Sequence, residues 1–318
     1  MDISVVISLF NEEESLQELT NGISSVIEKM QASYEIIMVN DGSTDSSWKK
    51  IQELSKNNSN IKGICFRRNY GKSAALYCGF EAAQGDVVIT MDADLQDDPN
   101  EIPELYRMVK EDGYDLVSGW KKKRLDNKLS KNLPSKIYNA TARKVTGIKL
   151  HDMNCGLKAY KNEVIKSIEV YGEMHRYIPY LAKNAGYSNI GEKVVQHHVR
   201  KFGKSKFGLD RFINGYLDLI SLWFLSRFGK KPMHFFGLVG SFTFFIGFVI
   251  TLWLIADKVI TQSQGLKFRA VTDQPLFYLA LVALIVGVQL FLTGFLAELV
   301  SRNASERNKY HIKEYTGK

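Results

Sequence analysis

The sequence has 318 residues, a formal net charge of +8 at pH 7, and 45% hydrophobic against 24% charged residues. These values are ordinary for a folded chain and exclude a disordered or fibrous protein. With only three cysteines, a disulfide framework is excluded and a reducing compartment is expected. The first 30 residues contain acidic groups and no basic start followed by an apolar run, so no secretory signal is predicted.

The first 120 residues alternate between short apolar runs and amphipathic segments. The predicted strands are 3–10, 34–39, 61–66, 86–91 and 115–118. The predicted helices are 11–30, 44–56, 71–84 and 100–110. Strands that alternate with helices at crossover spacing predict a Rossmann-like α/β fold, with a mostly parallel sheet and helices on both faces. Ligands of such sheets bind at the carboxyl ends of the strands.

After residue 119 this alternation stops. A helix is predicted at 136–145 and shorter strands at 155–160 and 190–195. Positive charge is concentrated in two segments of this region. Residues 121–149 contain ten Lys or Arg and one acidic residue, and residues 198–233 contain eight Lys or Arg and two acidic residues. Nucleic acid, anionic lipid headgroups or a small polyanion such as a diphosphate would each suit such charge. No nucleic-acid-binding motif accompanies it, so nucleic acid is not expected as a partner.

Two uncharged apolar runs follow, 235–256 and 275–297, with 22 and 23 residues. Each would reach about 33 Å as a helix, enough to cross a bilayer, so a two-helix transmembrane hairpin is predicted. The segment 208–231 has apolar residues at helical spacing and predicts an amphipathic helix in the membrane interface, with an ordinary packed helix as the alternative. Basic flanks outweigh the connecting loop, which places the domain 1–207 and the basic tail 298–318 in the cytoplasm.

Polar side chains follow two of the predicted strands. Asp92 and Asp94 stand one residue apart after the fourth strand and can face one divalent cation. Mg²⁺ or Mn²⁺ prefers such oxygen ligands and would neutralise a departing diphosphate; the alternative is a capped turn. Asp41 follows the second strand and can accept hydrogen bonds from a base or ribose, with turn formation as the alternative.

Five strings, in this order, resemble glycosyltransferase family 2 with the GT-A fold: 7–12 (ISLFNE), 40–45 (NDGSTD), 69–72 (NYGK), 91–97 (MDADLQD) and 203–206 (GKSK). The most similar group is the polyisoprenyl-phosphate glycosyltransferases, which includes dolichol-phosphate mannose synthase and bacterial undecaprenyl-phosphate enzymes. The resemblance covers roughly residues 1 to 210, and part of the group carries a C-terminal membrane hairpin.

The resemblance implies a UDP- or GDP-sugar donor, a polyprenyl-phosphate acceptor, Mg²⁺ or Mn²⁺, and inversion at the anomeric carbon. By position, the implied nucleotide-sugar ligands are Ser8, Phe10, Glu12, Asp41, Ala93, Arg200 and Lys206. The implied catalytic residues are Asp92, Asp94 and Gln96, of which Asp92 and Asp94 would bind the metal. Lys121 and Lys131 would contact the acceptor phosphate, and Asp152 the sugar hydroxyls.

Two features depart from the family pattern. The family usually has Pro where Ser8 stands, and Arg is common where Lys121 and Lys131 stand. Lys lacks the bidentate fork of Arg, so phosphate contacts at these positions would be made by a point charge.

The sequence therefore predicts a membrane-anchored enzyme that transfers a hexose from a nucleotide sugar to polyprenyl phosphate on the cytoplasmic face of the bacterial inner membrane. A processive polysaccharide synthase is the first alternative, but its usual Gln-x-x-Arg-Trp motif is not found. A non-catalytic membrane scaffold is the second, and the intact Asp92 and Asp94 pair argues against it. A homo-oligomer is left open.

Overall fold

The computed structural model describes residues 1–122, 140–143, 146–202, 221, 224, 227–228, 232–265, 270–303 and 312–317. The chain divides into two compact units. The first comprises Met1–Leu219 together with Arg307–Lys318, and the second comprises Ile220–Glu306.

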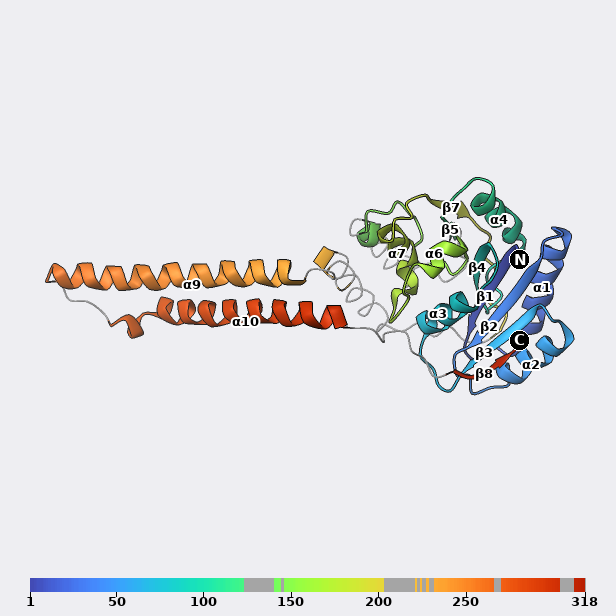
Figure 1. The fold of residues 1–318 in the computed structure, drawn as a ribbon, viewed down its shortest axis with the longest axis horizontal. Coiled ribbons are helices and arrows are strands. Elements are labelled where there is room, and N and C mark those ends of the chain that lie inside the picture. The colour runs from blue at the N-terminus through green and yellow to red at the C-terminus, as the bar shows by residue number, and fades with distance from the viewer. Residues whose placement is uncertain are drawn as a thin grey trace. The chain divides into compact units, whose positions relative to one another are not determined.

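An eight-stranded sheet forms the centre of the first unit (Figure 1). Its strands are β1 (Ile3–Leu9), β2 (Tyr34–Asn40), β3 (Ile61–Phe66), β4 (Val87–Asp92), β5 (Leu116–Trp120), β6 (Lys158–Lys161), β7 (Ile190–Val194) and β8 (Ile312–Thr316). Their spatial order is β7-β5-β6-β4-β1-β2-β3-β8. The run β4-β1-β2-β3 is parallel, as is the pair β5 and β7, whereas β6 and β8 are antiparallel to their neighbours. The mostly parallel α/β sheet expected from the sequence is confirmed.

Helices cover both faces of this sheet. They are α1 (Leu16–Lys29), α2 (Ser47–Asn57), α3 (Lys72–Ala82), α4 (Ile102–Lys110), α6 (Asn162–Lys166) and α7 (Ile178–Asn184), with short 3-10 turns η1 (Pro99–Glu101) and η2 (Met174–Tyr177). Val5 and Ile36 point to the face covered by α1, α2 and α4. Val6 points to the other face, where it packs against Gly79 of α3. Because both faces are covered, the central strands are mostly apolar, as the sequence suggested, although Ser4, Glu35 and Thr90 are buried among them.

The predicted starts of two helices were wrong. The helix expected from residue 11 begins at Leu16, and the one expected from residue 44 begins at Ser47. Asn11 has a left-handed backbone, with φ of 56°. Its amide donates to Ser43 Oγ at 2.9 Å, and a Glu13 carboxylate oxygen accepts from the Ser46 amide at 2.7 Å. The two segments therefore hydrogen-bond to each other before either helix begins, which competes with helix formation.

The expected helix at 136–145 lies mostly outside the described residues, as do Lys131, Lys206 and most of the expected interfacial helix 208–231. The strand expected from residue 155 begins at Lys158 instead. Residues 152–156 form a turn that approaches Asp92, and this turn delays the start of the strand.

The second unit is a pair of long apolar helices, α9 (Pro232–Ser263) and α10 (Pro275–Asn303), joined through η3 (Val271–Asp273). Only 17% of the most apolar window of each helix is buried. Large apolar side chains such as Phe242, Trp253 and Leu296 are more than half exposed. Exposure of so large an apolar surface to water is unfavourable, whereas the hydrocarbon of a lipid bilayer would cover it. Both expected spans lie within these helices, and the chain is a membrane-associated protein.

Small residues let α9 and α10 approach closely. A Cβ at Gly240 would lie 2.7 Å from the Gly287 carbonyl oxygen, and a Cβ at Gly287 would lie 2.6 Å from the Phe244 amide nitrogen. Ala280 and Leu254 are fully buried. Such contacts are typical of helices that associate in a bilayer, where no water is present to drive apolar side chains together.

The end of the chain returns to the sheet of the first unit. Strand β8, drawn in red, lies beside the blue β3, with Cys65 opposite Glu314 and Ile64 opposite Tyr315 (Figure 1). From the sequence we expected only a basic tail over 298–318, so this strand was missed.

The pairing of β8 with β3 predicts a specific disulfide. Direct partners on antiparallel strands carry their side chains on one face, and Cys65 carries a thiol opposite Glu314. We expect Glu314→Cys to form an intrachain disulfide with Cys65 under mild oxidation, because paired strands bring the Cα atoms within disulfide range. Non-reducing electrophoresis and peptide mass spectrometry would detect it.

Tyr315→Cys is the matched control, because adjacent strand residues point to opposite faces and this cysteine would face away from Cys65. If the thiol introduced by Glu314→Cys stays reduced, or links two chains instead of closing one, the pairing of β8 with its own sheet would be contradicted.

Candidate active site

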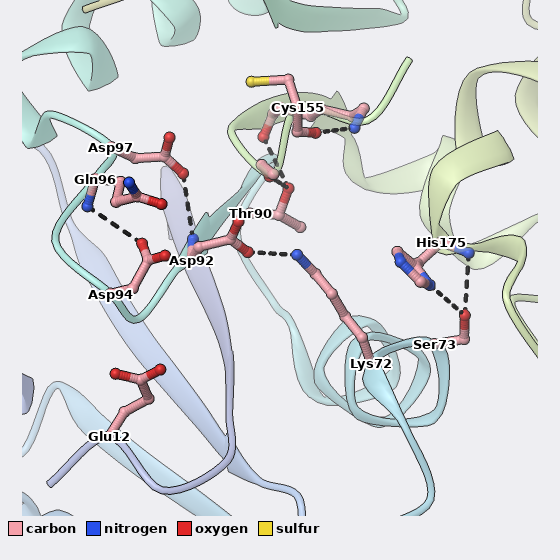
Figure 2. Close-up of polar contacts among 12 residues, drawn as sticks. Glu12, Lys72, Ser73, Thr90, Asp92, Asp94, Gln96, Asp97, Cys155 and His175 are labelled. Carbon is pink, nitrogen blue, oxygen red and sulfur yellow. Dashed lines mark hydrogen bonds and ion pairs between the residues drawn. The ribbon is translucent and has the colours of Figure 1, made fainter. Parts of the chain in front are cut away.

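The carboxyl ends of β1, β2 and β4 meet at one edge of the sheet. Ser8 of β1 pairs in register with Val39 of β2 on one side and with Asp92 of β4 on the other. The structure therefore brings together the residues expected at the donor site: Ser8, Phe10, Glu12, Asp41, Asp92, Ala93, Asp94 and Gln96 follow or end these three strands. Figure 2 shows the acidic part of this edge.

Asp92, the last residue of β4, is held between a cation and a backbone. The Lys72 ammonium, at the start of α3, forms an ion pair with Asp92 Oδ1 (Figure 2). On the other side, a Cβ at Gly156 would lie 2.6 Å from the Asp92 carboxyl carbon, so this position has no room for a side chain. Burial alone would raise the pKa of Asp92, but the charges of Lys72 and Lys121 lower it below its ordinary value. Asp92 is therefore ionised at neutral pH.

Asp94 lies in the loop that follows. Its Oδ1 accepts a hydrogen bond from the Gln96 amide at 3.2 Å, and its Oδ2 faces Arg200 at 3.2 Å. Burial raises the pKa of Asp94, and the negative charges of Asp92 and Asp97 raise it further. Leu95, which follows Asp94, has a left-handed φ of 60°. Such backbone strain is concentrated at functional sites.

Arg200 connects two loops of the site. Its guanidinium contacts Glu12 Oε1 at 2.9 Å and Asp94 Oδ2 at 3.2 Å. Glu12 itself is fixed by a hydrogen bond from its amide to Ser47 Oγ at 3.1 Å. The residue expected to contact the donor phosphates thus lies beside the expected metal ligand Asp94.

Lys121 follows β5 and points toward the same acidic cluster. It forms an ion pair of 2.6 Å with Asp97, whose side chain is fully buried. Burial would lower the pKa of the Lys121 ammonium, but Asp97 raises it well above its ordinary value. Asp97 also accepts a weak hydrogen bond from the Asp92 amide at 3.4 Å. The structure places Lys121 next to the carboxylates, and its contact with an acceptor phosphate stays a prediction.

Asp41 and Asp152 each stabilise a loop by accepting hydrogen bonds from backbone amides. The Asp41 carboxylate accepts hydrogen bonds from the amides of Tyr70 at 2.7 Å and Gly71 at 2.9 Å, and burial raises its pKa. Asp152 is buried and its Oδ1 accepts from the Asn154 amide at 3.1 Å, which shapes the turn leading to Gly156. The roles of Asp41 toward the nucleotide and of Asp152 toward the sugar stay predictions.

The acidic cluster fits a divalent cation. Within the part of the chain that the structure describes, no three His, Cys, Asp or Glu side chains form a protein-only metal site. Asp92 and Asp94 offer hard oxygen ligands, and the crowding of Asp92, Asp94 and Asp97 that raises the pKa of Asp94 is the repulsion that a cation would relieve. The remaining ligands would come from diphosphate oxygens.

Three residues of this site were given no role by sequence reasoning: Lys72, Asp97 and Gly156. Lys72 and Asp97 belong to two of the five strings, but their spacing does not reveal their partners. The available signal for Lys72 was its position directly after the loop that follows β3, because that loop ends at the ligand-binding edge of the sheet.

Comparisons with known proteins identify the family of this chain. Residues 4–169 match glycosyl transferase family 2. The dodecaprenyl-phosphate galacturonate synthase of Rhizobium johnstonii is 35% identical over 95% of this chain and 88% of its own length. The undecaprenyl-phosphate 4-deoxy-4-formamido-L-arabinose transferase of Aeromonas hydrophila is 35% identical over 98% of this chain and 93% of its own length.

Solved structures show the same fold. Glucosyl-3-phosphoglycerate synthase of Mycobacterium tuberculosis superimposes with a TM-score of 0.52 at 23% identity, covering 72% of this chain and 81% of that one. A complex of the same enzyme with Mn²⁺, UDP-glucose and glycerol 3-phosphate gives a TM-score of 0.51 at 22% identity, covering 72% and 80%. The chain belongs to glycosyltransferase family 2, has the GT-A fold, and is a glycosyltransferase.

The packing of Gly156 against Asp92 generates a prediction. We expect Gly156→Ala to weaken Mn²⁺ binding and to lower kcat/KM by about 100-fold, because the added methyl group must push the Asp92 carboxylate out of place. Titration with Mn²⁺ followed by electron paramagnetic resonance would measure the first effect. Gly22→Ala in α1 is the control, since a Cβ there meets only the Pro99 ring, at 3.3 Å and beyond. Unchanged Mn²⁺ affinity in Gly156→Ala would contradict the proposed packing constraint.

Proposed function

We propose that this glycosyltransferase transfers a hexose from a UDP- or GDP-sugar to polyprenyl phosphate, with inversion at the anomeric carbon and with Mg²⁺ or Mn²⁺ bound by Asp92 and Asp94. The observation that carries the proposal is the meeting of three carboxylates with three cationic side chains at one edge of the sheet. Asp92, Asp94 and Asp97 are paired there with Lys72, Arg200 and Lys121 respectively.

The acceptor is supported by the relatives and by the apolar helices. The two relatives are named for different sugars, a galacturonate and a formamido-arabinose, but both are named for a polyprenyl phosphate. The matches extend over at least 95% of this chain and so include α9 and α10. A lipid-linked acceptor is therefore the shared feature, whereas the hexose rests on the sequence resemblance.

A phosphate monoester needs little activation. Its second pKa is about 6, so near neutral pH a polyprenyl phosphate already carries a nucleophilic oxygen and a strong general base is not required. That oxygen forms the new bond to the anomeric carbon, and the bond from this carbon to the donor diphosphate breaks with its electron pair on the departing oxygen. A single displacement from the opposite face inverts the configuration.

The protein must therefore bring two polyanions together and hold them in line. Arg200, fixed between Glu12 and Asp94, would contact the donor phosphates, and Gln96 would lie beside the reacting centre. Lys206, Lys121 and Lys131 would add positive charge toward the donor and the acceptor phosphate. When bound, the divalent cation would neutralise charge on the leaving diphosphate. Preorganised charge of this kind lowers the barrier without reorganisation during the reaction.

The expected location is the cytoplasmic face of the bacterial inner membrane. Two features support it: the excess of Lys and Arg flanks the hairpin rather than its connecting loop, and the strand β8 connects the end of the chain to the sheet that contains β1. Both termini would then lie on the side where nucleotide sugars and the lipid phosphate meet.

The function is tested with the purified full-length protein in detergent. Incubation with labelled UDP- and GDP-sugars, undecaprenyl phosphate and Mg²⁺ or Mn²⁺ should yield a lipid-linked monosaccharide, identified by mass spectrometry. Asp94→Asn should lower turnover by at least about 100-fold, because one charged metal ligand is lost. Glu53→Gln, the same acid-to-amide change on the exposed face of α2, should leave turnover unchanged.

No lipid-linked sugar with any common donor would contradict the acceptor. A long polymer would favour the processive synthase instead, and nucleotide binding without any turnover would favour the non-catalytic scaffold.

A further inference from the structure

Lys72 is a cation of the site to which the expectations from sequence gave no role. We propose that Lys72 is a further catalytic residue: its ammonium neutralises Asp92 and, when the donor binds with its divalent cation, moves to the diphosphate and stabilises the departing nucleoside diphosphate. This inference rests on the proposed function, because it assigns a residue to the donor side of that reaction.

The backbone around Lys72 is fixed on both sides. Before it, the amides of Tyr70 and Gly71 donate to the two carboxylate oxygens of Asp41. After it, Ser73 Oγ lies 3.0 Å from both the amide nitrogen and Nδ1 of His175 (Figure 2). These contacts come from the end of β2 and from η2, so two segments far apart in the sequence set the start of α3. The lysine is thus held at one place along the edge of the sheet while its side chain keeps its own freedom.

Asp92 has little room to turn. A Cβ at Gly156 would lie 2.6 Å from its carboxyl carbon, so the backbone of Gly156 packs against this carboxylate. A divalent cation that binds Asp92 would therefore share the carboxylate with the Lys72 ammonium, which pairs with Oδ1. The repulsion between two positive charges at one carboxylate favours departure of the ammonium when the cation binds.

Of the three described cations that form ion pairs with Asp92, Asp94 and Asp97, Lys72 is the best able to move. Its side chain is 33% exposed, against 23% for Arg200 and 10% for Lys121. Arg200 bridges two carboxylates, Glu12 and Asp94, and Lys121 is paired with a fully buried one. The lysine ammonium, by contrast, is a compact charge on a flexible four-carbon stem. The donor diphosphate, which the divalent cation would hold beside these carboxylates, is the anion to which the ammonium would move.

This movement brings the positive charge of Lys72 to the diphosphate oxygen on which negative charge develops during the reaction. As the acceptor oxygen forms its bond to the anomeric carbon, the bond from that carbon to the diphosphate oxygen breaks, and the electron pair stays on the leaving nucleoside diphosphate. Lys72 remains protonated throughout and donates a charged hydrogen bond to that oxygen or its neighbour. Stabilisation of charge that grows in the transition state raises kcat more than it lowers KM.

Binding measurements on the full-length protein test the exchange of partners. In Lys72→Met we expect Mn²⁺ alone to bind at least about threefold more tightly, because the competing ammonium is gone. We expect UDP in the presence of Mn²⁺ to bind about tenfold more weakly, because a charged hydrogen bond is lost. Lys72→Arg, which keeps the charge, should restore most of the nucleotide affinity. Electron paramagnetic resonance measures bound Mn²⁺, and isothermal titration calorimetry measures UDP, with GDP as a second probe.

Lys110→Met is the matched control, because Lys110 also pairs with an aspartate, Asp86, but at the amino-terminal edge of the sheet. It should change neither affinity. A merely structural role of Lys72 predicts weaker Mn²⁺ binding and a lower melting temperature, and either unchanged or weaker Mn²⁺ binding would overturn the proposal. Unchanged UDP affinity would overturn it as well.

The kinetic arm is separate from these measurements. With the donor that supports transfer, Lys72→Met should lower kcat by about 100-fold and change the donor KM much less. If the unmodified protein transfers no sugar to polyprenyl phosphate, the proposed acceptor is wrong, and the two binding affinities still decide the role of Lys72.

Discussion

The repulsion among Asp92, Asp94 and Asp97 is the constraint on which the site depends. Burial raises the pKa of Asp94, and the charges of Asp92 and Asp97 raise it further. In the part of the chain that the structure describes, each of the three carboxylates pairs with a cation from another segment. Lys72 comes from the start of α3, Lys121 from the end of β5, and Arg200 from the segment after β7. The fold therefore serves mainly to bring these groups to one edge. A site balanced in this way can exchange one cation for another, which is what the binding of a metal-bound diphosphate requires.

Sequence reasoning located Asp92 and Asp94 together with two of the cations that face them, Arg200 and Lys121, but it gave no role to Asp97 or Lys72. The carboxyl ends of parallel neighbouring strands must meet, so Asp41, Asp92 and Asp94 could be placed at one edge from strand order alone. Partners of the carboxylates could not be found in this way, because Lys72 lies 20 residues from Asp92, and Arg200 lies 188 residues from Glu12. Such pairs depend on side-chain reach across the completed fold, and nothing in local periodicity encodes them.

Local competition and tertiary pairing explain the errors in the elements. The acidic residues after β1 looked like the first turn of a helix, but Asn11 and Glu13 hydrogen-bond to the segment after β2, and the helix begins only at Leu16. Strand β8 was missed because five residues, IKEYT, are too short for a strong strand pattern of their own. Its conformation comes from the exposed backbone groups of β3, and β-strand formation in general depends more on such context than on intrinsic preference.

Strand β8 follows α10 in the chain and pairs with β3, the strand that leads to Lys72. Without it β3 would be the edge of the sheet, with one row of backbone groups unpaired, whereas with it β3 is bonded on both sides, to β2 and to β8. Strand β3 ends at Phe66. The loop that follows donates two backbone hydrogen bonds to the Asp41 carboxylate, and α3 then begins at Lys72. A strand bonded on both edges opens less often than an edge strand, so the loop that it carries starts from a fixed point. The segment that follows the second apolar helix thereby stabilises the strand from which the catalytic lysine is positioned.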